Sequence, residues 1–324
     1  MLSQQVISDI ISTAIASISY PVAPADLYHP IEYTLESGGK RLRPQLLLAA
    51  CSAMGIPVEP GEGDGAINAA LGIEIFHNFT LLHDDVMDRA DLRRGRPTVH
   101  SKWNDNTAIL SGDAMLTMAT TYISRCRQEI MPAVMDLFNR TAMEIYEGQQ
   151  YDMDFEKRKD VTVDEYLNMI RLKTSVLLGC ACRMGAMIAG ADEADCDAFY
   201  DYGVNLGLAF QLRDDWLDTY GDPLVFGKEI GGDIVNEKKT WLLITALDEA
   251  SEELEAILDE DLEPAERIRQ VKAVYDRLDL SERCRQLIAR YAGDAVRSLA
   301  NVKLEADSRA YFTALAEESV NRNH

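Results

Sequence analysis

The chain has 324 residues, of which 47% are apolar, and its 32 basic and 54 acidic side chains give a formal net charge of −22. This length and apolar content allow a large buried core, while the negative charge disfavours nucleic acid and anionic membranes as partners. Because no linker or low-complexity tract divides the chain, the sequence predicts a single domain over residues 1–324.

The N-terminal segment is predicted to be an amphipathic packing helix. Apolar residues between positions 2 and 19 recur at helical spacing, and no Lys or Arg precedes them as it would in a signal peptide. No run along the chain is long and apolar enough to span a bilayer, so stable membrane insertion is not expected. Six cysteines without a Cys-x-x-Cys pair are typical of packing residues in a reducing cytoplasm.

Helical periodicity continues through nearly every later segment. Pro44 begins a helix that ends near Gly55, and Asp64 is predicted to cap a long helix from about Ala66 to Arg89. Further helices are predicted at 107–125, 132–153, 163–189, 194–220, 238–258, 264–278 and 281–299. Since sustained alternation of β-branched residues is absent, the predicted fold is all-α, a single large antiparallel helical bundle with essentially no sheet.

Two copies of one acidic signature follow apolar helices far apart in the chain. They are Asp84-Asp85-Val86-Met87-Asp88 and Asp214-Asp215-Trp216-Leu217-Asp218. An isolated Asp-Asp pair is usually a solvated surface feature, but here the preceding runs 73–83 and 206–213 are apolar. Residues i and i+4 share one helix face, and Mg²⁺ prefers carboxylate oxygens completed by water and substrate phosphates. The repeated motif therefore predicts a metal-bridged phosphate.

Three groups of basic residues interrupt this acidic chain in glycine- or proline-bearing loops. They are Gly38-Gly39-Lys40-Arg41-Leu42-Arg43-Pro44, Arg93-Arg94-Gly95-Arg96-Pro97-Thr98, and residues 227–240 with Lys228, Lys238 and Lys239. Paired glycines let backbone approach an anion closely, and arginine forks match phosphate oxygens. One such group alone could be a solvated charge run. Two acidic motifs, each followed directly by a basic loop, indicate a phosphate-bearing substrate.

With these motifs in this order, the chain resembles the trans-isoprenyl diphosphate synthases of the polyprenyl synthetase family. The matching segments are 38–44, 77–88, 93–98, 112–113, 148–149, 173–174, 210–218 and 227–233. The resemblance implies an all-α bundle around a deep central cavity, a homodimer, and a short-chain enzyme of the geranylgeranyl or farnesyl type. Such a prenyltransferase joins isopentenyl diphosphate head to tail (1′-4) to a dimethylallyl, geranyl or farnesyl diphosphate.

The resemblance also implies the metal ligands and the catalytic set. The residues expected to coordinate three Mg²⁺ ions, with Mn²⁺ as the alternative metal, are Asp84, Asp88 and Asp214. Those expected to support them directly or through water are Asp85, Asp215 and Asp218. The expected catalytic residues are Asp84, Asp85, Asp88, Asp214, Lys173 and Gln211.

Substrate contacts are implied in the same way. Residues expected to contact the allylic diphosphate are Arg93, Lys173, Lys228 and Lys238, and those expected to hold isopentenyl diphosphate are Lys40, Arg43, His77 and Arg94. Gln211 and Thr174 are expected to line the cavity near the reacting carbons. Metal-assisted ionisation of the allylic C–O bond would be followed by attack of the isopentenyl double bond. We hypothesise that the released diphosphate takes the proton, and that His83 orients the neighbouring aspartates.

Product length depends on the helix that precedes the first acidic motif. The family pattern makes Phe79 and Thr80 the expected floor of the cavity, with Phe76 one turn further. One bulky ring beside a small residue predicts a twenty-carbon product, with fifteen carbons as the alternative. Ordinary core packing is the competing interpretation of Phe76 and Phe79, and a floor elsewhere would involve Met115, Met118, Met143 or Tyr146.

Two other functions are compatible with part of this pattern. A class I terpene cyclase also ionises a prenyl diphosphate, but it normally pairs one Asp-rich motif with an Asn/Ser/Glu triad and needs no second diphosphate site. A catalytically silent regulatory subunit of a prenyl synthase commonly loses an acidic motif, whereas both are intact here.

Overall fold

The computed structural model describes residues 1–56, 58, 65–222 and 230–321 of the chain. The chain forms two compact units, one made of residues 1–139 and 180–199 and the other of residues 140–179 and 200–324. Three long helices contribute residues to both units: α7 (Met131–Phe155), α9 (Val176–Ile188) and α10 (Glu193–Tyr220). The single domain expected over residues 1–324 stays a prediction.

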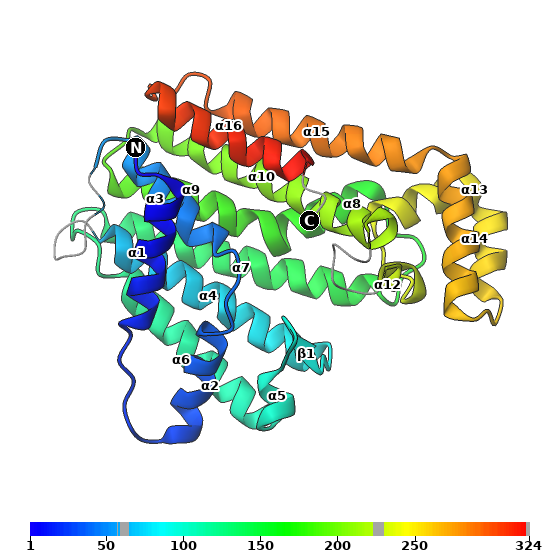
Figure 1. Ribbon diagram of the computed structural model, residues 1–324, viewed down its shortest axis with the longest axis horizontal. Coiled ribbons are helices and arrows are strands. Elements are labelled where there is room, and N and C mark those ends of the chain that lie inside the picture. The colour runs from blue at the N-terminus through cyan, green and yellow to red at the C-terminus, as the bar shows by residue number, and fades with distance from the viewer. Residues whose placement is uncertain (57, 59–64, 223–229, 322–324) are drawn as a thin grey trace. The chain divides into compact units, whose positions relative to one another are not determined.

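The first unit is organised around one buried helix. Its own helices are α1 (Gln4–Ala16), α2 (Ala25–Leu35), α3 (Leu42–Ala53), α4 (Ala66–Met87), α5 (Val99–Lys102) and α6 (Asp105–Ile123) (Figure 1). Helix α4 packs most extensively against α6 and also contacts α1, α2, α3 and α5. Every residue from Ala69 to Phe76 is buried, because a helix that is apolar on all sides is stable only when other elements surround it. Its C-terminal end carries the first acidic motif.

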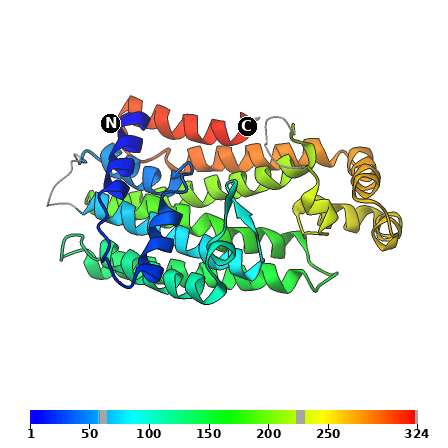
Figure 2. The ribbon, with the colours of Figure 1, turned by 60° about the horizontal axis from the view of Figure 1, so that its bottom comes forward.

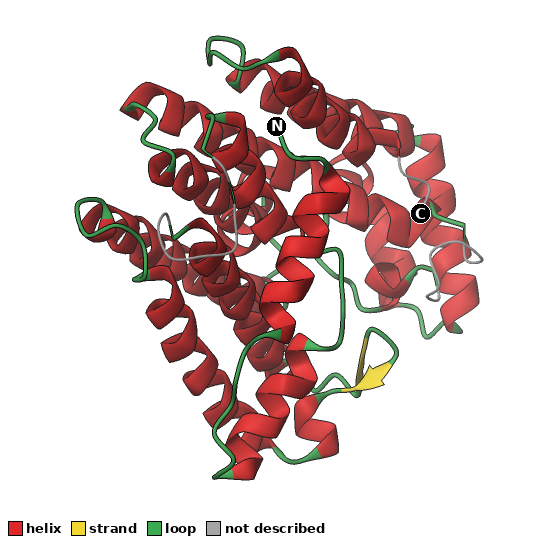
Figure 3. Cartoon of the chain, turned by 60° about the vertical axis from the view of Figure 1, so that its left-hand side comes forward, coloured by secondary structure: helices red, strands yellow, loops and turns green. Residues whose placement is uncertain are grey.

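A short hairpin follows α4. Strands β1 (Leu92–Arg93) and β2 (Arg96–Pro97) pair antiparallel, with Arg93 opposite Arg96. The two turn residues, Arg94 and Gly95, have φ values of 53° and 73°, as the mirror-image turns of tight hairpins require. This is the one strand pair in the residues that the structure describes (Figure 3), so the expectation of essentially no sheet is confirmed.

The second unit is helical in the residues described. It contains α8 (Val163–Ile170), the π-helical segment η1 (Arg171–Ser175), α12 (Gly232–Val235), α13 (Trp241–Asp259), α14 (Pro264–Arg277), α15 (Leu280–Ser298) and α16 (Ala306–Asn321). Helices α15 and α16 lie side by side in both Figure 1 and Figure 2. The buried Tyr202 of α10 donates to the Phe312 carbonyl at 2.8 Å, which ties α16 to α10.

Several boundaries differ from the sequence prediction. The helix expected over 163–189 is interrupted by η1, and α13 changes direction at Ala250, whose φ and ψ are −145° and 43°. Helix α4 ends at Met87, and it begins directly after Gly65, whose backbone has the left-handed conformation. Asp64 lies outside the described residues. Helices α2 and α16 were not predicted.

Two expectations about apolar residues can be compared with the structure. All six cysteines are buried, in agreement with a packing role. Among the helices described here, none combines the length and the apolar character that crossing a bilayer requires.

Candidate active site

The first acidic motif separates into buried and exposed carboxylates at the end of α4. Asp85 is 5% exposed and accepts a hydrogen bond from Arg93 Nε at 2.6 Å. Burial raises the pKa of Asp85, and the Arg93 guanidinium opposes that rise. Asp88 ends the helix on its exposed side, and Asp84 is half-buried. The motif is therefore bonded to the basic hairpin through its second residue, Asp85.

His83, next to this motif, is held by helix α6. Its Nε2 atom lies 3.1 Å from the Ile109 carbonyl oxygen, and its ring packs edge-on against Phe79 at 4.7 Å. Gly112 permits this approach, since a Cβ there would lie 2.2 Å from His83 Nε2. These contacts fix the ring against α6 and Phe79, and orientation of the aspartates by His83 stays a prediction.

Arg43 and His77 meet in the first unit. Arg43 Nη1 lies 3.0 Å from His77 Nε2. Because a guanidinium has only donors, His77 Nε2 accepts and the ring is neutral, with its proton on Nδ1. Burial, followed by the charges of Arg43, Arg94 and Arg93, holds the pKa of His77 well below its usual value.

A carboxylic acid that sequence reasoning missed lies behind this pair. Glu74 is 3% exposed, one turn before Asn78, which donates to Glu74 Oε1 at 3.0 Å. Burial raises the pKa of Glu74, while the Asn78 hydrogen bond and then the Arg43 charge lower it. Burial has the opposite effect on the neighbouring cation and lowers the pKa of Arg43 to about 10. An acidic residue inside an apolar helix was the available signal for this site.

Arg94 rests on the paired glycines that precede α3. Its Nη1 donates to the Gly38 carbonyl oxygen and to Ser37 Oγ, the latter at 3.3 Å. A Cβ at Gly39 would lie 2.7 Å from Arg94 Cζ, and the φ of 127° at Gly39 also favours glycine. Because Arg94 also acts on the pKa of His77, the structure brings Arg43, His77 and Arg94 into one basic cluster.

Lys40 follows the paired glycines directly. Its side chain is exposed, and its carbonyl oxygen accepts from Gln45 Nε2 at 2.7 Å. It therefore shares the loop on which Arg94 rests.

Aromatic rings of the first unit anchor the hairpin. The Tyr33 hydroxyl donates to the Pro97 carbonyl at 2.8 Å, and the Arg96 guanidinium lies 4.1 Å above the Tyr33 ring centroid. Lys102 contacts the same ring at 3.9 Å, and Trp103 packs edge-on against it at 5.3 Å. Such cation–π contacts stabilise a hairpin too short to be stable alone. The sequence contains no periodic signal for this cluster.

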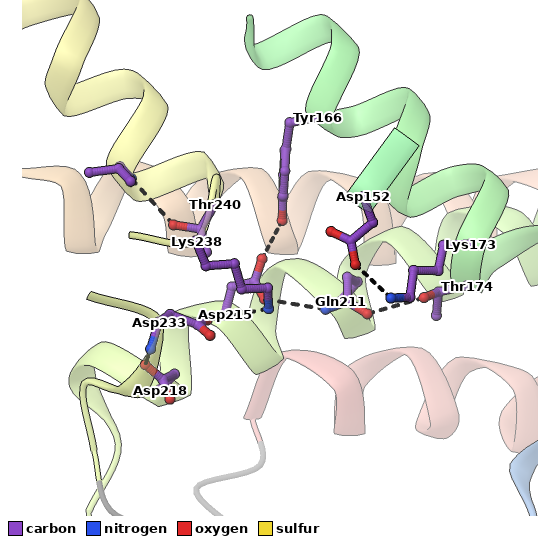
Figure 4. A network of polar contacts seen from close by, with 11 residues as sticks. Asp152, Tyr166, Lys173, Thr174, Gln211, Asp215, Asp218, Asp233, Lys238 and Thr240 are labelled. Carbon is purple, nitrogen blue, oxygen red and sulfur yellow. Dashed lines mark hydrogen bonds and ion pairs between the residues drawn. The ribbon is translucent and has the colours of Figure 1, made fainter. Parts of the chain in front are cut away.

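The second acidic motif likewise has a buried second residue, Asp215, while its first residue is exposed. A larger network of polar contacts surrounds Asp215 (Figure 4). Asp215 is 4% exposed. Its Oδ2 accepts from the Tyr166 hydroxyl at 2.5 Å, and its Oδ1 accepts from Gln211 Nε2 and Lys238 Nζ, both at 3.2 Å. Asp214, by contrast, lies on the exposed side of α10.

Asp218 and Asp233 continue this network. Asp218 Oδ2 accepts from the Asp233 backbone N–H at 2.9 Å, and Lys238 Nζ lies 3.4 Å from Asp233 Oδ2. Burial raises the pKa of Asp233 to about 7, against the lowering effect of Lys238. Partial burial lowers the pKa of Lys238, but Asp215 and Asp233 outweigh it and leave the pKa raised. Lys228, expected in the same loop, lies outside the described residues.

The π-helical segment η1 carries Lys173 and Thr174. Lys173 Nζ lies 2.6 Å from Asp152 Oδ2, and Thr174 Oγ1 donates to Gln211 Oε1 at 3.2 Å. Gln211 thus links Thr174 to Asp215. Short π-helical turns occur frequently at functional sites, but hydrophobic periodicity does not distinguish them from an α-helix, so the sequence did not reveal this one.

The residues expected to limit product length form an aromatic cluster in the first unit. Phe76 is fully buried and Phe79 is 5% exposed, with ring centroids 5.5 Å apart. Phe138 packs edge-on against Phe76 at 5.0 Å. Thr80 is half-buried, and its hydroxyl donates to the His77 carbonyl at 2.8 Å.

Comparison with known proteins identifies the family. Residues 24–278 match the polyprenyl synthetase family. The chain belongs to this family. It is 41% identical over 240 residues to a geranylgeranyl diphosphate synthase of Methanosarcina mazei, covering 74% of this chain and 72% of that protein. It is 38% identical over 304 residues to a geranylgeranyl pyrophosphate synthase of Geoglobus acetivorans, covering 93% and 92%.

Solved structures agree with this assignment to the polyprenyl synthetase family. A crystal structure of a geranylgeranyl pyrophosphate synthase matches with a TM-score of 0.93 and 42% identity over 99% of both chains. The geranylgeranyl pyrophosphate synthetase of Pyrococcus horikoshii matches with a TM-score of 0.89 and 29% identity over 98% of this chain and 97% of that one. The chain therefore has the all-α fold of the isoprenoid synthases.

Polyprenyl synthetases use a divalent metal ion, and the donor chemistry of both acidic motifs fits one. The middle carboxylates, Asp85 and Asp215, are buried and bonded to basic or hydroxyl groups, whereas Asp88 and Asp214 are exposed. Exposed carboxylate oxygens suit a hydrated hard cation. Within the residues that the structure describes, no group of three or more His, Cys, Asp or Glu side chains is arranged to hold a metal.

Proposed function

We propose that this chain is a trans-prenyl diphosphate synthase that elongates an allylic diphosphate with isopentenyl diphosphate and releases diphosphate. The observation that carries the proposal is the presence of two intact acidic motifs. The second residue of each motif is bonded to a basic residue that follows it in the chain. Asp85 bonds Arg93, and Asp215 bonds Lys238. The relatives that are named geranylgeranyl diphosphate synthases support a geranylgeranyl-type product.

The basic cluster of Arg43, His77 and Arg94, with Lys40, is proposed to bind the diphosphate of isopentenyl diphosphate. Guanidinium groups donate several parallel hydrogen bonds to phosphate oxygens. The neutral His77 accepts from Arg43, and this contact orients the guanidinium. Arg94 is oriented in the same way by the backbone of Gly38. These contacts would organise the cluster before an anionic ligand binds.

The allylic diphosphate is proposed to bind through Arg93, Lys173, Lys228 and Lys238. Asp84, Asp88 and Asp214 would hold three Mg²⁺ ions, with Asp85, Asp215 and Asp218 in support. A divalent ion bound there neutralises the charge that develops on the departing diphosphate. Thr174 and Gln211, joined by a hydrogen bond of 3.2 Å, would lie beside the reacting carbons. Asp152 holds Lys173 and thereby orients its ammonium group.

Incubation with labelled isopentenyl diphosphate and dimethylallyl, geranyl or farnesyl diphosphate tests this proposal. We expect elongation, and chromatography of the dephosphorylated products should show the twenty-carbon alcohol. A cyclic hydrocarbon would instead support a terpene cyclase. Turnover only after addition of a second, active synthase would support a regulatory subunit. Asp214→Asn is the variant to compare with the wild type in the same assay, and it should abolish elongation without unfolding the protein.

Product length is proposed to depend on the aromatic cluster of Phe76 and Phe79, with Thr80 beside it. Phe79→Ala should lengthen the products, because it removes a ring from the segment that precedes the first acidic motif. Phe312→Ala is the control, since Phe312 is a buried ring of α16 that packs against Tyr202 at 5.1 Å and should leave product length unchanged. Unchanged products from Phe79→Ala would place the floor elsewhere.

The assembly and location of the protein are proposed from the family. We expect a homodimer in the cytoplasm, and light scattering of the purified protein tests the first part. Fractionation of the native cell tests the second. A monomer with full elongation activity would contradict the proposed assembly.

A further inference from the structure

Tyr166 is a buried tyrosine with a single, defined hydrogen-bond acceptor among the described contacts. It lies on α8, is 0% exposed, and donates its hydroxyl to Asp215 Oδ2 at 2.5 Å (Figure 4). Burial and the Asp215 carboxylate both raise the pKa of Tyr166, so the hydroxyl remains a donor at neutral pH. A phenylalanine would fill the same space without this bond.

The three described donors to Asp215 divide between its two oxygens. Tyr166 occupies Oδ2, while Gln211 and Lys238 share Oδ1 at 3.2 Å each. A buried carboxylate is stable only when its lone pairs are bonded. Removing the Tyr166 hydroxyl would leave Oδ2 without this donor, and rotation of the carboxylate to recover one would displace Gln211 and Lys238.

The position of the Tyr166 hydroxyl is itself fixed by the start of α8. Thr162 caps this helix, its Oγ1 accepting from the Glu165 N–H at 3.2 Å while Glu165 Oε2 accepts from the Thr162 N–H at 2.9 Å. Arg158 adds an ion pair to Glu165 at 2.8 Å. Such a capping box determines where a helix begins, and Tyr166 is the residue that follows Glu165.

The same helical segment reaches α10 at a second point. Beyond Tyr166 it continues into η1, where Thr174 donates to Gln211. Segment 163–175 is therefore joined to α10 through Asp215 at one end and through Gln211 at the other. Two attachment points restrict rotation of the segment relative to α10 more than either would alone.

We propose that Tyr166 is a positioning residue, whose hydroxyl orients the Asp215 carboxylate so that Gln211 and Lys238 are presented correctly to the allylic diphosphate. This role rests on the proposed function for the identity of the ligand. The Tyr166 hydroxyl is bonded to Asp215 Oδ2. Its effect is exerted through Asp215.

The test compares Tyr166→Phe with Tyr202→Phe. Tyr202 is also 0% exposed and donates its hydroxyl at 2.8 Å, to the Phe312 carbonyl, away from the acidic motif. Two quantities are measured for each variant: kcat with the allylic substrate, and the Kd of inorganic pyrophosphate in the presence of Mg²⁺ by calorimetry. Loss of a group that hydrogen-bonds a metal ligand typically costs about 10–100-fold in metal affinity or activity.

We expect Tyr166→Phe to lower kcat by about tenfold and to raise the pyrophosphate Kd by a similar factor. The KM for isopentenyl diphosphate should not change, and Tyr202→Phe should change none of these values. If Tyr166→Phe and Tyr202→Phe behave alike, the hydroxyl has only a structural role and the proposal is overturned.

A double-mutant cycle with Asp215→Asn isolates the pathway. Because Tyr166 acts through Asp215, the effect of Tyr166→Phe on the pyrophosphate Kd should disappear when Asp215 is replaced. Independent, multiplicative effects would contradict the proposal. If Tyr166→Phe does not fold, an unchanged pyrophosphate Kd in Asp215→Asn overturns the proposal, because Tyr166 can act only through Asp215.

Failure of the proposed function gives a different pattern. A wild-type protein that does not elongate prenyl chains, but whose Mg²⁺-dependent pyrophosphate binding still requires Tyr166, would retain the positioning role and lose only the reaction.

Discussion

Gly148 allows α7 to contact the backbone of the π-helical segment, and its replacement provides a sharp prediction. A Cβ at Gly148 would lie 2.3 Å from Lys173 N and 2.7 Å from Lys173 Cα. Ordinary contacts begin at 3.4 Å, so Gly148→Ala requires a separation of about 1.1 Å. The atoms it meets belong to backbone and cannot rotate away. The segment that carries Lys173 and Thr174 must therefore move.

Two effects of Gly148→Ala follow from this displacement. Overpacking of this kind typically lowers the free energy of unfolding by about 1–3 kcal/mol. A misplacement of about 1 Å in a site that positions substrate can reduce the rate by about a hundredfold. We expect both losses, measured by urea unfolding and by incorporation of labelled isopentenyl diphosphate.

Gly293→Ala is the control for this experiment. Gly293 lies inside α15, and the nearest atom to an added Cβ is Arg297 Nη1 at 3.1 Å, at the far end of a flexible side chain. Alanine should stabilise this helix by about 0.5–1 kcal/mol and leave the rate unchanged. If Gly148→Ala instead matches the stability and rate of the wild type, the close approach of α7 to Lys173 is wrong.

Three further predictions concern other buried or anchoring groups. Burial raises the pKa of Glu74 above 4.5, so the stabilisation that this carboxyl provides is complete below its unfolded pKa and is lost as pH rises through its folded pKa. Glu74→Gln should therefore make the free energy of unfolding in urea fall less as pH rises above 4.5, and an unchanged slope would contradict this. Arg213 donates to the Glu318 and Ser319 carbonyls at the end of α16. Arg213→Met should lower the free energy of unfolding by about 1–3 kcal/mol and speed hydrogen exchange in residues 306–321. Full protection of these residues would refute the prediction. Tyr33→Ala removes the ring under Arg96 and should raise the KM for isopentenyl diphosphate by about fivefold, equivalent to about 1 kcal/mol, with the allylic KM as the internal control.

Helix type and most helix positions were predictable because they depend on local periodicity. The helices predicted from Ala66, over 132–153 and over 194–220 correspond closely to α4, α7 and α10. The π-helical segment was not predictable, since its extra residue per turn depends on close packing against glycines such as Gly148 and Gly207. The aromatic contacts of Tyr33 also involve residues separated by long stretches of chain, which local patterns do not relate.

The sequence predicts which residues make up the site, but it does not predict how they bond to one another. Among the residues expected in the site, the structure places Asp85 beside Arg93 and Arg43 beside His77. The role of Asp85 and Asp215 as supporting metal ligands stays a prediction, and the structure adds that each carboxylate is bonded within the protein. Glu74 and Tyr166 were missed because neither belongs to a charged motif.

The sequence by itself determined the all-α architecture, the two acidic motifs and the basic loops. Donor chemistry and helical spacing are properties of neighbouring residues, so they can be read along the chain. Only the tertiary structure decided which oxygen of Asp215 bonds Tyr166 and which bonds Gln211 and Lys238. That choice depends on the packing of α8, α10 and the start of α13, which brings residues distant in sequence within hydrogen-bond distance.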